Sequence, residues 1–165
     1  MFGYKGIDPY GYSNYASTRD DGTYPHNCTS FAAHMLYYNN RFDSNIAFLG
    51  NASQWDNRAY LVTDAVVGTT PHVGDIAVWD YFGGPAGHVA FVYDLITNSV
   101  GNTIGVIVVD DQYGNRRTTI TRYYKRDTIT NIISTAYPDH FISFAKKPSG
   151  GGQGWDMLSL GQVNP

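Results

Sequence analysis

Residues 71–95, with the sequence PHVGDIAVWDYFGGPAGHVAFVYDL, carry the clearest structural pattern in the chain. Within it, Ile76–Asp80 and Val89–Leu95 follow a period-two hydrophobic pattern, and the glycine-rich segment Gly83–Gly87 separates them. Such a pattern is typical of strands that bury one face, whereas glycine and proline mark loops. The stretch therefore predicts two neighbouring strands joined by a loop.

The same pattern recurs three times downstream, in Ile104–Asp110, Thr118–Tyr124 and Phe141–Ala145. The segment Asn98–Asn102 is rich in turn-forming residues and predicts a tight connection between the second and third strands. Sequential strands with short connections favour an antiparallel sheet.

Two helices are predicted ahead of these strands. In residues 28–38, apolar side chains recur at helical spacing and form one stripe, made of Cys28, Phe31, Ala32, Met35 and Leu36. Asn27 precedes this run and is a good N-cap residue. A second, shorter helix is predicted around Ala52–Tyr60. Helices followed by an antiparallel sheet define an α+β fold.

The composition excludes several classes of protein. The chain has 165 residues with 42% hydrophobic content, enough for one domain with a real core, which argues against disorder. The net charge of -3 and the pI near 5.9 argue against nucleic-acid binding. The longest apolar run, Ile104–Val109, is too short to insert into a membrane. We expect a monomer.

The chain divides into a domain and a tail. We expect residues 1–147 to form the domain, with residues 1–26 as a covering segment rich in turns, and residues 148–165 to form a glycine-rich linker or tail. The N-terminus, Met1–Gly6, lacks a basic region followed by an apolar stretch, so we expect no secretory signal peptide.

The single cysteine, Cys28, is the first candidate for chemistry. With no second cysteine there is no internal disulfide. Cys28 falls on the first turn of the predicted helix, where unpaired N–H groups and the helix dipole stabilise a thiolate over a thiol. The alternative is a buried core cysteine, because Cys28 shares the apolar stripe.

The candidate base is His88, which opens a predicted strand directly after the glycine-rich loop. If this strand and the next form a hairpin, Asp110 or Gln112 can reach His88 and orient it, and Asp111 is a third choice. The alternatives are a strand-end histidine bonded to its loop, and polar residues that begin a turn. His140 lies beside Pro138 and Asp139 and is expected at the surface.

These motifs resemble those of the CHAP family, the cysteine, histidine-dependent amidohydrolases/peptidases. The nucleophile motif is matched by Asn27–Ala33, and the family's Pro-x-x-Gly-Asp-Ile/Val-Ala-x-Trp segment by Pro71–Trp79, followed by Gly87–Ala90. Leu49–Ala52 is similar to the segment between them, and the resemblance covers about residues 25–147. It implies a papain-like fold, peptidoglycan-cleaving activity, Cys28 as nucleophile and His88 as general base.

The resemblance also implies roles for neighbouring residues. Asp110 and Gln112 stand where the family commonly has Glu and Asn, and Asn27 stands where it often has Gln, which can help to hold an oxyanion. Tyr81 and Phe82 are candidates for an aromatic wall that binds substrate, and Gly87 for the rim of the cleft, whereas Trp79 is expected in the core.

One segment of the chain, just before Cys28, is a candidate for metal binding. Some CHAP domains carry a calcium loop just before the nucleophile, where this chain has Asp20 and Asp21 followed by Gly22. Calcium takes six to eight oxygen ligands, and the flanking residues supply few. We therefore expect an ordinary Asp-Gly turn and no metal or other cofactor.

The function implied is hydrolysis of peptidoglycan from a Gram-positive cell wall. The bond is either the N-acetylmuramoyl-L-alanine amide or a peptide bond of the stem or cross-bridge, and the expected context is a phage lysin acting at the wall. Two alternatives stay open. One is a non-catalytic CHAP-like domain that binds wall or scaffolds a partner, and the other is a papain-like peptidase of protein substrates.

Overall fold

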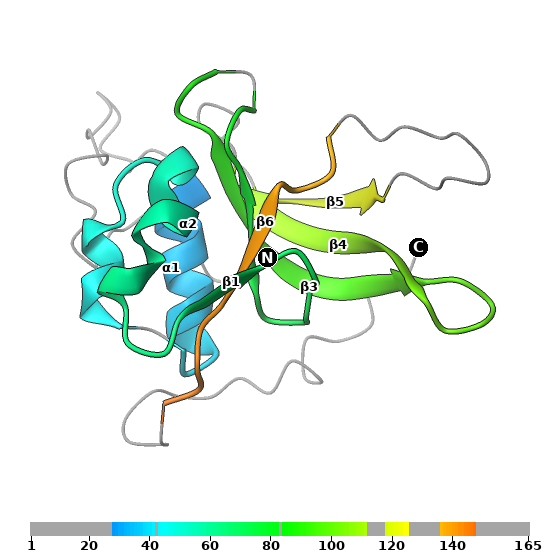
Figure 1. Cartoon of the computed structure of the whole chain (residues 1–165), viewed down its shortest axis with the longest axis horizontal. Helices are drawn as coiled ribbons and strands as arrows, with labels where there is room; N and C mark the ends of the chain where they lie inside the picture. Colours follow the sequence, from blue (N-terminus) through cyan, green and yellow to red (C-terminus); the bar gives the residue numbers. More distant parts are fainter. Residues whose placement is uncertain (1–27, 42, 83, 112–117, 126–135, 148–165) are drawn as a thin grey trace.

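The structure, a computed structural model, describes residues 28–41, 43–82, 84–111, 118–125 and 136–147. These residues form helices packed on an antiparallel sheet (Figure 1). The sheet has six strands in the order β1-β6-β2-β3-β4-β5. The strands are β1 (Val66–Gly68), β2 (Ile76–Trp79), β3 (His88–Thr97), β4 (Thr103–Asp111), β5 (Thr118–Tyr124) and β6 (His140–Ser143). The α+β fold expected from the sequence is confirmed.

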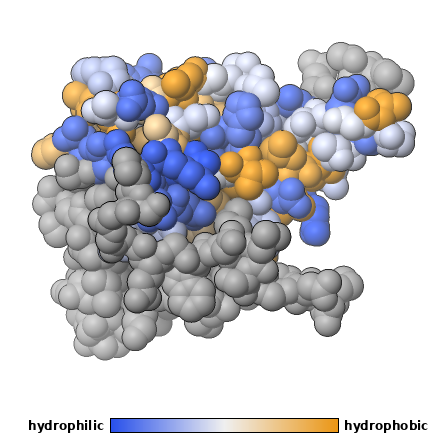
Figure 2. Space-filling model, turned by 90° about the horizontal axis from the view of Figure 1, so that it is seen from below, coloured by the Kyte–Doolittle hydropathy of each residue, from blue (hydrophilic) through white to orange (hydrophobic). Residues whose placement is uncertain are grey.

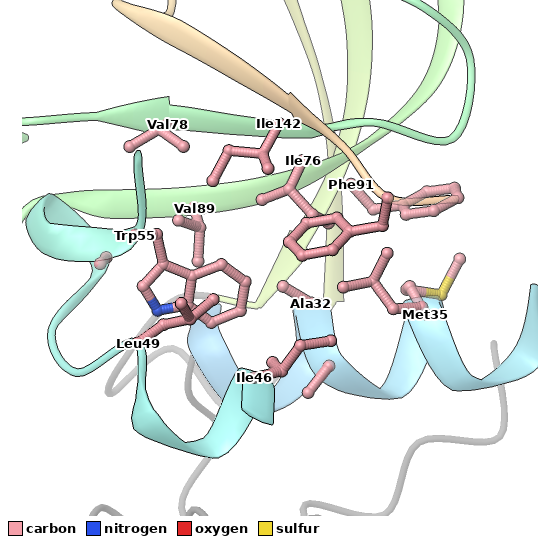
Figure 3. Packing of buried hydrophobic residues seen from close by; sticks show 14 of the residues in the cluster. Ala32, Met35, Ile46, Leu49, Trp55, Ile76, Val78, Val89, Phe91 and Ile142 are labelled. Atoms are coloured by element: carbon pink, nitrogen blue, oxygen red, sulfur yellow. The ribbon is translucent and has the colours of Figure 1, made fainter. Parts of the chain in front are cut away.

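Helix α1 (Cys28–Tyr38) coincides with the helix predicted from residues 28–38. It packs against β3 and β4 and covers one face of the sheet (Figure 1). Figure 3 shows Ala32 and Met35 of this helix facing Phe91 and Ile76 of the strands, with Trp55 filling the space beside them. The apolar stripe of α1 is thus the side that builds the core, and its first residue is held at one end of the sheet.

The second predicted helix is a series of short helical turns. Residues 52–61 form η2 (Ala52–Gln54), α2 (Trp55–Arg58) and η3 (Ala59–Leu61), with the indole of Trp55 fully buried. The sequence did not indicate η1 (Ser44–Phe48) or strand β1. Strand β1 has only three residues, all exposed, so it carries no alternation that a pattern could reveal. None of the described helices is long and apolar enough to cross a membrane.

The central strands bury both faces. Ile76, Val78, Val89 and Phe91 face the helices, whereas a second cluster on the other face contains Ala77, Trp79, Ala90, Val92 and Tyr123. Trp79 is 2% exposed, as its predicted place in the core required. At the surface, hydrophobic and hydrophilic side chains are interspersed (Figure 2).

Gly74 and Asp75, the Gly-Asp pair of the Pro71–Trp79 motif, hold the start of β2 in place. Gly74 has φ +93° and lies against the guanidinium of Arg41, where a side chain would have little space. Asp75 is 1% exposed, accepts the His72 N–H at 2.8 Å through Oδ2, and accepts the Ser143 hydroxyl at 2.7 Å through Oδ1. A buried carboxylate is stabilised by such hydrogen bonds, so this pair shapes the entry to β2 and joins it to β6.

Candidate active site

Cys28 is the first residue of α1 and a free, half-buried thiol. The first N–H groups of a helix have no intrahelical partner, and the helix dipole is positive at this end. The sulfur of Cys28 is therefore close to the positive end of the helix dipole while remaining partly accessible, as a nucleophile requires.

His88 and Asp110 meet on the sheet face opposite α1. His88 opens β3 opposite Trp79, and Phe91 faces Val109 across the β3–β4 ladder. Because strand side chains alternate, His88 and Asp110 lie on the same face near the end of this ladder. The His88 Nε2–H donates to Asp110 Oδ2 at 2.7 Å, with side chains that are 6% and 0% exposed.

The imidazole of His88 also hydrogen-bonds the Cys28 side chain. Since Nε2 is engaged by Asp110, Nδ1 is the ring nitrogen left for the sulfur. Burial lowers the pKa of His88, but the hydrogen bonds to Asp110 and Cys28, together with the charges of both groups, outweigh burial and raise this pKa from 6.5 to about 9. The imidazole of His88 is therefore positively charged at neutral pH.

Aromatic rings enclose the imidazole. The Phe82 ring stacks on His88 with centroids 4.9 Å apart and an angle of 24°, and the Trp79 ring lies 5.4 Å away. Trp79 is fixed in turn by its Nε1–H, which donates to the Ala136 carbonyl at 2.8 Å. Tyr123 packs on Trp79, and burial together with the charge of Asp110 raises its pKa to about 12, so the phenol stays neutral.

The structure thus gives Phe82 a contact that sequence reasoning missed. Phe82 lies in a loop without periodicity, so only its aromatic character drew attention, and a role in binding substrate was expected. Its ring also contacts the candidate base, and the role of Phe82 in binding substrate stays a prediction. Tyr81 is 73% exposed, so it is free to meet a substrate, and that role stays a prediction.

The loop before His88 is anchored rather than free. Ser53 donates its backbone N–H to Ala86 and its hydroxyl to the Pro85 carbonyl, both at 2.9 Å. Gly87 has φ +68°, and a Cβ there would collide with the Trp79 carbonyl and with Ser53. Packing therefore requires glycine at this position, and the predicted contact of Gly87 with substrate remains a prediction.

Four predicted site residues cannot be placed in this geometry. Asn27, Gln112 and the two candidate calcium ligands, Asp20 and Asp21, lie outside the described residues. So do the proposed covering segment 1–26 and the tail 148–165, and the division of the chain at residue 147 stays a prediction. Among the described side chains, Asp110 is in contact with His88.

A helix-borne cysteine beside a strand-borne histidine and aspartate, on an antiparallel sheet, defines the papain-like class of fold. The CHAP domain family matches residues 19–112 of this chain, which is more than half of its length. The chain belongs to the CHAP family, and the resemblance seen in its motifs is confirmed.

Two solved structures are similar to the chain. One is "The crystal structure of Ly7917 with the hydrolyzing product of MDP", with 15% identity and a TM-score of 0.50, over 82% of this chain and 60% of that one. The other, "The crystal structure of Ly7917", has 14% identity and a TM-score of 0.49, over 86% and 63%. The chain thus spans about 60% of Ly7917, and the likeness concerns the fold. A search of curated proteins found no match.

Proposed function

We propose that this protein is a peptidoglycan hydrolase that cleaves an amide bond with Cys28 as its nucleophile. The observation that carries the proposal is the position of His88, whose buried imidazole hydrogen-bonds Asp110 on one side and Cys28 on the other. Membership of the CHAP family supports peptidoglycan as the substrate class. The similar fold of Ly7917, crystallised with the hydrolyzing product of MDP, agrees with a hydrolytic role.

In the first step, the Cys28 thiolate attacks the carbonyl carbon of the amide. In this scheme the backbone N–H of Cys28, at the start of α1, donates to the oxyanion that develops. As the C–N bond breaks, the His88 imidazolium gives the Nδ1 proton to the leaving amine. The product is an acyl-enzyme thioester and a free amine, with His88 neutral.

In the second step, His88 acts as the base. Neutral Nδ1 takes a proton from water, the resulting hydroxide attacks the thioester carbonyl, and the Cys28 thiolate leaves. Throughout, Asp110 holds the imidazole in the orientation that presents Nδ1 to the sulfur. Asp110 touches neither substrate nor sulfur in this scheme, so it is a positioning residue.

The proposed substrate is the wall of a Gram-positive bacterium, as a phage lysin would meet it. Both the N-acetylmuramoyl-L-alanine amide and a peptide bond of the stem or cross-bridge can react by this scheme, because both are amides. The exposed ring of Tyr81, next to the loop that leads to His88, is proposed to contact the substrate.

The test is turbidity loss of purified Gram-positive cell walls, with released ends identified by mass spectrometry. We expect lysis by the wild-type chain and none by Cys28→Ala or His88→Ala, whereas Tyr60→Ala serves as a matched surface control because Tyr60 is 79% exposed. The new amino ends name the bond. Lysis by Cys28→Ala at the wild-type rate would refute the mechanism, and wall binding without cleavage by the wild type would favour a non-catalytic domain.

A further inference from the structure

A second cluster of polar side chains lies where three elements meet, away from the Cys28–His88 pair. Asp56 belongs to α2, Asp80 directly follows β2, and His140 opens β6. One ligand atom from each of these residues lies within 4.8 Å of the others. Because Val78 pairs with His140 across the β2–β6 ladder, the sheet itself brings Asp80 and His140 to the same end. His140, expected at the surface, is half-buried here.

One ring nitrogen in this cluster is close to a carboxylate but not bonded to it. His140 Nδ1 lies 2.9 Å from Asp56 Oδ2, yet it is a buried atom with no hydrogen bond among the described residues. The distance is short enough, so the two groups must be misaligned. Asp56 Oδ1 already accepts the Asn57 N–H at 2.7 Å, and the Asp56 side chain is only 7% exposed.

This arrangement is the one expected of two neighbouring ligands of a single cation. Two ligand atoms that are each about 2.1 Å from a tetrahedral zinc ion lie about 3.4 Å from one another. His140 Nδ1 and Asp56 Oδ2, at 2.9 Å, are close to that separation. Their lone pairs then point to the metal and not to each other, so a short, misaligned nitrogen–oxygen pair results. The pair is close enough for an ion pair, but a hydrogen bond would direct the N–H at the oxygen.

The charges of the cluster also favour a cation. Asp139 adds a third carboxylate, and its Oδ2 accepts the backbone N–H of Asp80 at 2.9 Å. Two carboxylates therefore lie beside one imidazole, with that of Asp139 near Asp80, and within the described residues no lysine or arginine forms an ion pair with them. Asp80 is exposed, so its side chain can turn inwards to complete a coordination sphere.

We propose that Asp56, Asp80 and His140 bind one divalent cation of the zinc class. Imidazole with carboxylates suits zinc and similar transition metals, whereas calcium and magnesium prefer oxygen ligands alone. Three protein ligands leave a fourth position for water. The cation links α2 to the ends of β2 and β6, next to the residues that lead into the loop before His88. The site is independent of the proposed hydrolysis.

The test is calorimetric titration with zinc chloride of the full chain carrying Cys28→Ala, after removal of metals with a chelator. Cys28→Ala removes a thiol that can itself bind zinc beside His88. We expect one equivalent of zinc per chain and a higher melting temperature. His140→Gln or Asp80→Asn should each weaken zinc binding by about tenfold or more. His72→Gln is the matched control, because His72 is an exposed histidine 3.2 Å from an aspartate elsewhere.

Three results would overturn the proposal. They are the absence of stoichiometric zinc binding, binding that survives both His140→Gln and Asp80→Asn, and binding that His72→Gln weakens equally. A parallel titration with calcium chloride assigns the class of cation, and tighter binding of calcium than of zinc would refute the zinc class. Circular dichroism of each variant shows whether the fold is retained, and Asp80→Asn alters an exposed side chain.

Discussion

The hydrogen bond between His88 and Asp110 offers the most direct test of the proposed mechanism. Its two atoms are 2.7 Å apart, and the carboxylate is fully buried. Asp110→Asn keeps the shape of the side chain and removes its charge. We expect this substitution to lower the pKa of His88 while leaving Cys28 and His88 in place.

The magnitude follows from the pKa of His88. Its rise from 6.5 to about 9 corresponds to about 3 kcal/mol in favour of the charged ring. Burial opposes this rise. Asp110→Asn leaves the burial unchanged, so in this variant only the interaction with Cys28 still raises the pKa of His88. The proposed first step needs the imidazolium, which is present below its pKa and lost above it. The alkaline limb of the pH profile should therefore move from about pH 9 to lower pH by about one unit or more.

The assay is the initial rate of wall turbidity loss between about pH 5 and pH 10. At neutral pH we expect Asp110→Asn to lower this rate by about 10–100-fold, a smaller loss than that of Cys28→Ala, because a positioning residue can be partly replaced. An alkaline limb that stays near pH 9 in Asp110→Asn would refute the reasoning. A silent Asp110→Ala with a severe Gln112→Ala would assign the orienting role to Gln112.

Three further predictions concern the surroundings of the site. Phe82→Leu removes the π face that stacks on the His88 ring and keeps an apolar side chain, so the alkaline limb of the turbidity assay should move down by about half a pH unit, whereas Phe82→Tyr should leave it unchanged. Gly87→Ala should lower the free energy of unfolding in urea by about 2 kcal/mol, because φ is +68° and a Cβ meets the Trp79 carbonyl; an unchanged midpoint would contradict this. Asp75→Ala should cost about 2 kcal/mol or more in the same assay, since it leaves buried hydrogen-bond donors without their acceptor, and a loss below 0.5 kcal/mol would count against its structural role.

Much of the fold follows from short-range patterns. The apolar stripe after Asn27 predicted α1 to the residue, and period-two runs located β2 to β6 within a few positions. These elements carry apolar residues at helical or strand spacing, so their positions can be read from consecutive residues, even though β2 and the first half of β3 are buried on both faces. Strand β1 has no such signal, because it is exposed and is held only by pairing with β6, as Val67 with Ile142.

The candidate site was partly visible in the sequence. Cys28 and His88 could be identified from the sequence. Cys28 lies at a predicted helix start and His88 follows a glycine-rich loop, and both of these are local features of the sequence. The choice among Asp110, Asp111 and Gln112 was not available, since neighbours in one strand differ only in register. The β3–β4 ladder, with its shift between Val92 and Asp94, brings Asp110 to His88, whereas Gln112 lies outside the described residues and its role stays a prediction.

Reading the residues in order is enough to predict the α+β class, the helix that carries Cys28, the strand that carries His88 and the motifs of the family. These depend on periodicity and on the order of residues along the chain. Only the tertiary structure decided that Asp110 bonds His88, that Phe82 stacks on its ring, and that Asp56 and His140 meet. The physical reason is that these contacts join segments far apart in the chain, and sheet register and loop anchoring set them.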